Sequence, residues 1–270
     1  EASMGLEQFE LIGESPPMQD LERDLRRVAP TDATVLIHGE SGTGKELVAK
    51  DIHQLGVDPK RPFVTVDCTN IPATLMESEL FGHEAGAFTD ARTRKQRVIE
   101  GAAGGTLFLD EVGEMPSETQ IKLLRVLEDR KVARIGANEE IEVNVRMVAA
   151  TNADLEKSVR EGRFREDLFY RIAVVRIDLP PLRERRQDIP LFLAMFVEQF
   201  CRRDGLSPKQ IHPAAEAMLM SRPWLGNIRE LENAVEMALI RPQERTVIEI
   251  GDFPAARESA QPPDATPEAG

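Results

Sequence analysis

The chain has few cysteines, and they give no sign of a disulfide framework. Only two cysteines, Cys68 and Cys201, occur in 270 residues, and their number and spacing fit neither a set of disulfides nor a metal site. A reducing compartment, the cytoplasm, is therefore predicted.

Long apolar runs and an excess of positive charge are also missing. No apolar stretch reaches the length that a membrane span needs, and no signal peptide opens the sequence, so we expect no contact with a membrane. The formal net charge of −13 has the wrong sign for a domain that grips a nucleic-acid backbone unaided. The remaining composition, 41% apolar and 30% charged, is typical of a globular protein with one large domain or a core domain and a smaller one.

Apolar strand patterns alternate with helical patterns through residues 10–179. This alternation predicts an α/β fold in which helices cover a parallel sheet. The expected strands lie at 35–37, 62–68, 104–111, 145–152 and 174–179.

Two expected helices carry start signals. Ser15 is a predicted N-cap before Pro16 and Pro17. Ser117 and Gln120 predict a capping box at the start of a second helix. The apolar residues predicted to face inward from this second helix are Ile121, Leu124 and Leu127.

The motif G-x-x-x-x-G-K spans Gly39–Lys45, between a strand pattern and a helical one. Glycines let backbone N–H groups close on phosphate oxygens, and the start of the following helix adds a positive dipole. Lys45 is expected to reach the β- and γ-phosphates of a nucleotide. Glu46 stands where Ser or Thr usually holds Mg²⁺, so the metal must depend more on an acidic residue elsewhere. The predicted phosphate loop comprises Gly39, Glu40, Ser41, Gly42, Thr43, Gly44, Lys45 and Glu46.

A pair of carboxylates ends the apolar strand pattern TLFLDE. Asp110 is predicted to hold Mg²⁺, directly or through water, and Glu111 to polarise the water that attacks the γ-phosphate. The alternative is an acidic strand end that faces solvent. Together with the phosphate loop, the pair predicts a nucleoside-triphosphate hydrolase.

Tandem prolines at Pro180–Pro181 predict a domain boundary, because proline continues neither a helix nor a central strand. Beyond them the pattern is wholly helical, and one helical face carries Ile189, Leu193, Phe196 and Phe200. We predict an N-terminal extension over 1–8, a nucleotide-binding α/β domain over 9–181, a smaller all-helical lid domain over 182–253 and a disordered linker over 254–270.

Six segments, taken in order, resemble one known family: GESGTGKE, ESELFGHEAGAFTDA, GGTLFLDEVGEMP, FREDLFYRI, LPPLRERRQDI and WLGNIRELEN. Over residues 9–253 the chain resembles the central AAA+ domain of bacterial enhancer-binding proteins, the NtrC-family activators of sigma-54 RNA polymerase. The resemblance implies an ATPase that uses ATP and Mg²⁺, a homo-oligomeric ring (hexamer or heptamer), and DNA recognition only through a missing C-terminal domain. In that family Glu46 is the usual residue.

The resemblance also assigns catalytic roles to polar residues outside the phosphate loop. Asn152, which ends the strand pattern at ATN, is similar to the first sensor. Arg165 and Arg171 resemble arginine fingers that reach the neighbouring subunit's site. The alternative for both arginines is an ordinary surface ion pair, because charges alternate through FREDLFYRI.

Four further residues have roles that the resemblance alone implies. Arg229 resembles the second sensor, although a solvated helix face is the alternative. Ile12 and Gly13 are similar to residues that lie against the adenine ring. Arg134 stands where the family has another intersubunit arginine.

The sequence departs from the family pattern at two positions. The loop Gly86, Ala87, Phe88, Thr89, Asp90, Ala91 stands in place of GAFTGA, the family's contact with the sigma factor. Asp90 adds a charge and restricts backbone angles that glycine allows. Asp67 stands where asparagine is usual as a switch for the catalytic glutamate. If Asp67 meets Glu111, the pKa of one of the two carboxyls is raised. Our hypothesis is that the switch works through a shared proton or through a different partner.

Three functions fit these patterns. The first is a motor that remodels sigma-54 RNA polymerase through the loop 86–91. The second is a nucleotide-gated regulatory scaffold whose motor has been blunted by Asp67 and Asp90. The third, a general AAA+ remodeller of DNA or protein, is disfavoured by the GAFT residues and by the negative net charge.

Overall fold

The chain forms two compact units, one ending at Pro180 and the other beginning at Pro181. A computed structural model of the chain describes residues 11–56, 58–82, 98–133, 140–240 and 245–255. Within these ranges, every helix is too short or too polar to cross a lipid bilayer.

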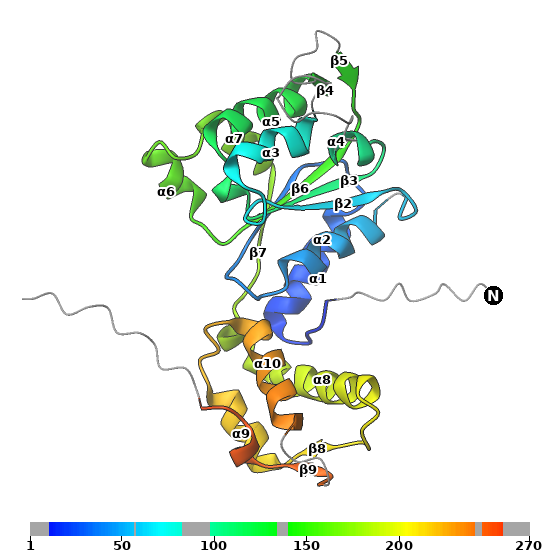
Figure 1. Ribbon diagram of the computed structural model, residues 1–270, viewed down its shortest axis with the longest axis vertical. Helices are drawn as coiled ribbons and strands as arrows, with labels where there is room; N and C mark the ends of the chain where they lie inside the picture. Colours follow the sequence, from blue (N-terminus) through cyan, green and yellow to red (C-terminus); the bar gives the residue numbers. More distant parts are fainter. Residues whose placement is uncertain (1–10, 57, 83–97, 134–139, 241–244, 256–270) are drawn as a thin grey trace, which may run out of the picture. The chain divides into compact units, whose positions relative to one another are not determined.

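A five-stranded parallel sheet forms the centre of the first unit (Figure 1). Its strand order is β2-β3-β6-β1-β7, and every neighbouring pair is parallel. The strands are β1 (Val35–His38), β2 (Phe63–Asp67), β3 (Thr106–Asp110), β6 (Arg146–Thr151) and β7 (Val175–Asp178). The predicted α/β fold is confirmed, and the loops that follow β1, β3 and β6 meet at one edge of the sheet.

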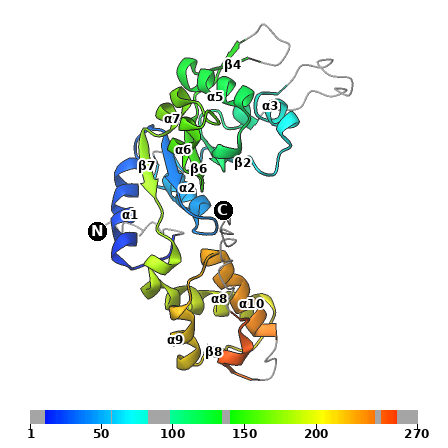
Figure 2. The ribbon, with the colours of Figure 1, turned by 90° about the vertical axis from the view of Figure 1, so that its left-hand side faces the viewer.

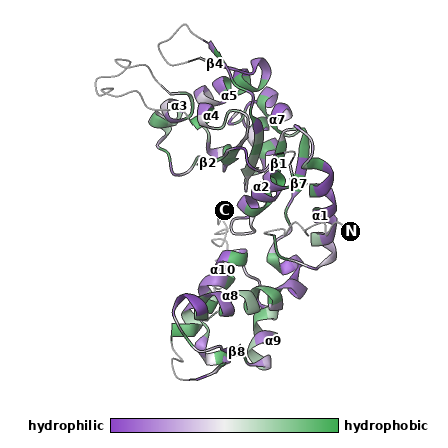
Figure 3. Cartoon of the chain, turned by 90° about the vertical axis from the view of Figure 1, so that its right-hand side faces the viewer, coloured by the Kyte–Doolittle hydropathy of each residue, from purple (hydrophilic) through white to green (hydrophobic). Residues whose placement is uncertain are grey.

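Helices cover both faces of this sheet because successive residues of each strand point to opposite sides. Val35 and Ile37 pack in a cluster with α1 and α2, whereas Leu36 packs in a second cluster with α3, α5 and α7 (Figures 1 and 2). Figure 3 shows the strands mostly in green and α1 largely in purple. The helices are α1 (Pro16–Val28), α2 (Lys45–Gln54), α3 (Ala73–Phe81), α4 (Val98–Gly101), α5 (Ser117–Asp129), α6 (Leu155–Arg160) and α7 (Glu166–Ile172).

Shorter elements complete the described part of the first unit. The 3-10 turn η1 (Val112–Glu114) follows β3, and an antiparallel pair, β4 (Lys131–Ala133) and β5 (Glu140–Glu142), follows α5.

Helix α5 starts differently from its prediction. Its N-cap is Pro116, and no side chain caps it, so the capping box predicted from Ser117 and Gln120 is wrong. Ile121 is 38% exposed, so its predicted inward position is also wrong. The buried stripe begins one residue earlier, at Gln120, and continues through Leu123, Leu124 and Leu127, which is the i, i+3, i+4, i+7 spacing of a helix face.

Helix α1 is held at its C-terminal end by an arginine from the sheet. Ser15 is its N-cap, as predicted, although the Ser15 side chain makes no capping bond. At the other end, the Arg146 guanidinium donates to the carbonyl oxygens of Ala29 (2.6 Å) and Val28 (2.9 Å). Burial lowers the pKa of Arg146. A cation that binds the last carbonyls of a helix satisfies orphan acceptors and complements the helix dipole.

The second unit is mostly helical but includes a short strand pair. It contains α8 (Ile189–Arg203), α9 (Pro213–Ser221) and α10 (Asn227–Ile240), with 3-10 turns η2 (Leu182–Glu184), η3 (Arg186–Asp188) and η4 (Ile250–Asp252). The predicted apolar face of α8 is buried. The parallel pair β8 (Gln210–Ile211) and β9 (Val247–Ile248) corrects the prediction of a wholly helical pattern.

Replacement of Arg146 by methionine is expected to lower the free energy of unfolding of the first unit by about 2 kcal/mol, because charged hydrogen bonds to helix carbonyls are lost. The measurement is urea unfolding followed by far-UV circular dichroism. Tryptophan fluorescence would report on the second unit, because the single tryptophan, Trp224, belongs to it. Arg176→Met is the control: Arg176 makes exposed ion pairs with Asp178 and Glu156, which contribute about 0.5 kcal/mol. Equal losses in the two variants would contradict the role given to Arg146.

Candidate functional site

The predicted phosphate loop is a tight turn between β1 and α2 whose backbone requires glycine. Gly42 and Gly44 have φ of 77° and 104°, a region that side-chain-bearing residues rarely adopt. At Gly39 an added Cβ would lie 3.0 Å from Leu179 Cβ and 3.1 Å from Thr43 Oγ1. The loop is thus compact, and it ends on the first residue of α2, where the helix dipole favours an anion.

Lys45, the first residue of α2, turns its side chain back across this loop. Its side chain is 6% exposed, and its ammonium donates to the carbonyl oxygens of Gly39 (3.0 Å) and Glu40 (3.4 Å). It also forms an ion pair with Glu111, with 3.1 Å between Nζ and Oε1. The sequence predicted that Lys45 lies at the loop, but nothing in the motif predicted this ion pair.

Glu111 follows β3 in the left-handed backbone region, with φ and ψ both 50°. Its Oε2 accepts a hydrogen bond from the backbone N–H of Asn152, at 2.9 Å. Lys45, Glu111 and Asn152 thus come together from the ends of three adjacent strands, β1, β3 and β6. We call these three residues the Lys45–Glu111–Asn152 cluster. The resemblance implied that Asn152 is the first sensor, and the contact seen here uses its backbone N–H.

Asp110 lies beside this cluster and is only partly exposed. Burial raises the pKa of its carboxyl, the Glu111 charge raises it further, and the Lys45 charge opposes the change. The Asp110 carboxylate accepts a hydrogen bond from the Glu111 N–H at 3.0 Å.

In the described part of the chain, no three His, Cys, Asp or Glu side chains gather into a metal site of their own. A single carboxylate suits Mg²⁺, whose remaining ligands are ordinarily substrate phosphates and water. Asp110 therefore fits the predicted metal role, and Glu46 pairs with Lys50 on the exposed side of α2.

Asp67 ends β2 in register with Asp110. Its carboxylate accepts hydrogen bonds from the Thr69 N–H (2.9 Å), the Thr69 hydroxyl (2.6 Å) and the Asn70 amide (2.6 Å). A carboxylate that binds the N–H two residues later forms a local turn. The described hydrogen bonds of the Asp67 carboxylate are thus with its own loop, whereas Glu111 is held by Lys45 and Asn152. No described contact joins the two carboxyls, although such a contact is the condition for a shared proton.

The two predicted arginine fingers lie on and beside α7. Arg165 is exposed, and its guanidinium binds both carboxylate oxygens of Asp167, at 3.0 and 2.7 Å. Arg171 donates to the Leu127 carbonyl at 3.1 Å. Among the described contacts, none joins either arginine to the Lys45–Glu111–Asn152 cluster of the same chain. The surface ion pair given above as an alternative is present for Arg165.

The remaining predicted residues are less fully placed. Ile12 and Gly13 are half-buried, next to Leu11, whose N–H donates to the Asp51 carboxylate of α2 at 3.2 Å. Arg229 is exposed on α10, in the second unit. Arg134 and the loop 86–91 lie outside the described residues.

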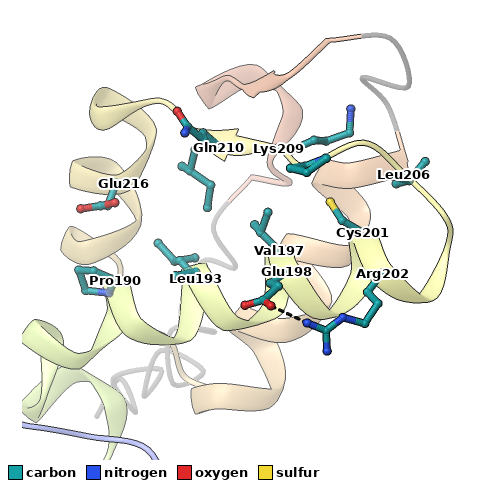
Figure 4. A pocket seen from close by; sticks show the side chains of 13 residues that line it. Pro190, Leu193, Val197, Glu198, Cys201, Arg202, Leu206, Lys209, Gln210 and Glu216 are labelled. Atoms are coloured by element: carbon teal, nitrogen blue, oxygen red, sulfur yellow. Dashed lines mark hydrogen bonds and ion pairs between the residues drawn. The ribbon is translucent and has the colours of Figure 1, made fainter.

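A cavity of about 570 Å³ lies within the second unit, beside α8 (Figure 4). Leu193, Val197 and Cys201 of α8 line it, together with the Glu198–Arg202 ion pair. None of the residues predicted for nucleotide chemistry lines this cavity. The candidate site is therefore the phosphate loop with its adjoining cluster, not this cavity.

Sequence analysis gave Gln120 a capping role and missed its contacts near the site. Gln120 bonds to the loop that follows Glu111 and to the segment that carries Arg165. The signal that could have found it is its place as the only polar member of the buried i, i+3, i+4, i+7 stripe on α5.

Two family models match the chain. The sigma-54 interaction domain matches residues 11–178, and the AAA+ ATPase lid domain matches residues 183–269.

Curated relatives are similar over most of the chain. The transcriptional regulatory protein ZraR of Salmonella typhimurium is 51% identical over 233 residues, which are 86% of this chain and 53% of ZraR. The DNA-binding transcriptional regulator NtrC of the same organism is 47% identical over 256 residues, which are 95% of this chain and 54% of NtrC. The chain thus spans about half the length of these relatives.

Crystal structures of NtrX from Brucella abortus are similar as well. The complex with ADP has a TM-score of 0.86 at 41% identity and covers 94% of this chain and 57% of NtrX. The complex with ATP has a TM-score of 0.84 at the same identity. Because the first family model matches more than half of the residues, the chain belongs to the sigma-54 interaction domain family of AAA+ transcriptional activators.

Proposed function

We propose that this chain hydrolyses ATP and uses the energy to remodel closed complexes of sigma-54 RNA polymerase. The observation that carries the proposal is the convergence of Lys45, Glu111 and the Asn152 N–H at the glycine-rich loop. A cation, a carboxylate and a loop of backbone N–H groups are the parts that phosphoryl transfer to water requires. The ADP and ATP complexes of NtrX support the choice of nucleotide.

The chain's own residues divide the work of hydrolysis. The loop N–H groups and Lys45 bind phosphate oxygens, and Glu111 orients the attacking water and accepts its proton. Lys45 now lies 3.1 Å from Glu111, so phosphate oxygens compete with this carboxylate for the ammonium. Binding of a nucleotide therefore weakens the ion pair and frees Glu111 for water. Asp110 is the residue that would hold Mg²⁺, an ion that neutralises phosphate charge when bound.

We further propose that each site is completed by a neighbouring copy, in a hexameric or heptameric ring. Arg165 is exposed and has no described contact with the Lys45–Glu111–Asn152 cluster of its own chain. Beside it on the same segment, Tyr170 is 67% exposed and Val174 is 58% exposed. Large apolar side chains left exposed around an arginine are typical of a protein interface. Binding a neighbour would require Arg165 to exchange Asp167 for phosphate.

The contact with sigma-54 RNA polymerase is assigned to the loop 86–91, which lies outside the described residues. Its support is the family match and the retained Phe88 and Thr89. A nucleotide-gated scaffold is the second candidate, since Asp167 already binds the Arg165 guanidinium within the chain.

Glu111→Gln is expected to lower kcat for ATP by about a hundredfold or more, because the general base is lost while the shape of the side chain is kept. Equilibrium binding of ATP should persist, since Lys45 no longer has a competing carboxylate. Steady-state turnover and nucleotide binding measure the two effects. Glu114→Gln is the matched control on the exposed side of η1, and a Glu111→Gln variant with the parent's kcat would refute the assignment.

Arg165→Ala is expected to lower kcat by about a thousandfold, because the finger stabilises charge on the transferring phosphoryl group. In the parent chain, ATPase activity per protein should rise with protein concentration, since a lone copy holds an incomplete site. Arg160→Ala, an exposed arginine on α6, is the control. A flat, low rate from a parent chain that still binds ATP would favour the scaffold.

Asp90→Gly is expected to increase open-complex formation by sigma-54 RNA polymerase several-fold, because glycine allows left-handed backbone angles that aspartate rarely adopts and the change removes a charge. The measurement is ATP-dependent transcription from a sigma-54 promoter, with ATPase turnover recorded alongside. Absence of sigma-54-dependent transcription from both chains, despite turnover, would exclude polymerase as the partner.

A further inference from the structure

A single buried glutamine joins two segments that the proposed mechanism uses separately. Gln120 of α5 is 1% exposed. Its amide nitrogen donates to the carbonyl oxygens of Met115 (2.8 Å) and Arg163 (3.1 Å), and its amide oxygen accepts from the Arg165 N–H (2.9 Å). Met115 ends the loop that begins with Glu111, and Arg165 carries the proposed finger.

The chemistry of these three bonds fixes the orientation of the amide. Backbone carbonyls only accept and the Arg165 N–H only donates, so the amide fits one way round. A buried amide with all of these partners present is rigid, whereas loss of one partner leaves a buried polar group unsatisfied. The side chain thus holds the backbone of residue 115 in a fixed position relative to the backbone of residues 163–165.

The backbone of Arg165 is anchored more firmly than its side chain. The N–H of Arg165 is bound to the buried Gln120, and α7, which begins at the next residue, is held in the core by Leu168 and Ile172. The guanidinium itself is exposed and binds only the exposed Asp167 among its described partners. The point from which the finger extends is therefore set by Gln120.

We propose that Gln120 is a positioning residue that ties the Arg165 finger to the Glu111 loop of the same subunit. The inference rests on the proposed function, in which Arg165 completes a neighbour's site. A shift of the Glu111 loop then moves Met115, Gln120 and the finger backbone together. One subunit's nucleotide state is in this way passed to the hydrolysis site of the next.

The test separates two functions of one subunit: the arginine finger that it contributes to its neighbour's site, and the hydrolysis site of its own. A Glu111→Gln chain lends a finger but cannot hydrolyse, and an Arg165→Ala chain keeps a competent site but lends no finger. Mixed in equal amounts, the two are expected to recover ATPase activity that neither has alone. Gln120→Met, which keeps the side-chain length and removes all three bonds, is then added to one partner at a time.

The positioning role predicts an asymmetric result. With Gln120→Met in the Glu111→Gln chain, recovered turnover should fall about tenfold, because small misplacements of a catalytic group cost this much or more. With Gln120→Met in the Arg165→Ala chain, it should change by less than about twofold. Thr119→Val, a polar-to-apolar change at the adjacent buried position of α5, is the matched control in both partners. ATP binding and thermal unfolding of each chain establish that the partners are folded.

Every other outcome decides against the inference. Equal losses in the two arrangements mean that Gln120 supports the fold of the unit and does not position the finger. No loss in either arrangement means that Arg165 is placed without it. The mixture of Glu111→Gln and Arg165→Ala chains, without Gln120→Met, is the reference. If it recovers no activity although both chains bind ATP, the shared site itself is refuted, and this inference is refuted with it.

Discussion

The ion pair between Lys45 and Glu111 is the contact that joins the separate parts of the candidate site. It joins the helix after β1 to the end of β3, and the N–H of Asn152, the residue after β6, binds the same Glu111 carboxylate. Lys45 is almost wholly out of water, so the pair carries a cost of desolvation. The Gly39 carbonyl, which binds the ammonium, and the Asn152 N–H, which binds the carboxylate, offset this cost. In the proposed function, a phosphate that competes for the ammonium turns Lys45 into a phosphate-binding cation and leaves Glu111 as a free base.

Parallel pairing brings these groups together from distant parts of the sequence. In the order β3-β6-β1, three adjacent strands end at the same edge, so residues 45, 111 and 152 meet there. The helices on both faces bury apolar side chains of alternating strand positions and thereby hold the register. A slip by one residue would turn Leu36 and Val35 to the wrong faces, and the edge would lose its alignment. The geometry of the site is thus set by the core.

The fold was predictable from the sequence because apolar runs and helical periods alternate clearly over the first unit. The glycine-rich turn between β1 and α2 and the acidic end of β3 were predictable as local structures, because an apolar strand pattern precedes each of them. Side-chain partners were harder to predict. Asp67 bonds to its own loop rather than to Glu111, and Gln120 bonds to Met115, Arg163 and Arg165 rather than forming a capping box. In each case a polar side chain had several partners within reach, and only three-dimensional packing selects among them.

The close approach of Gly39 to Leu179 connects the start of the glycine-rich loop to the end of the first unit. Leu179 follows β7 and donates its N–H to the His38 carbonyl, which directly precedes Gly39. One residue later the first unit ends, at Pro180. Leu179, which directly precedes the stiff Pro180–Pro181 connection, is therefore held next to the first glycine of the loop. A side chain larger than hydrogen at residue 39 would press on Leu179, so this contact restricts residue 39 to glycine.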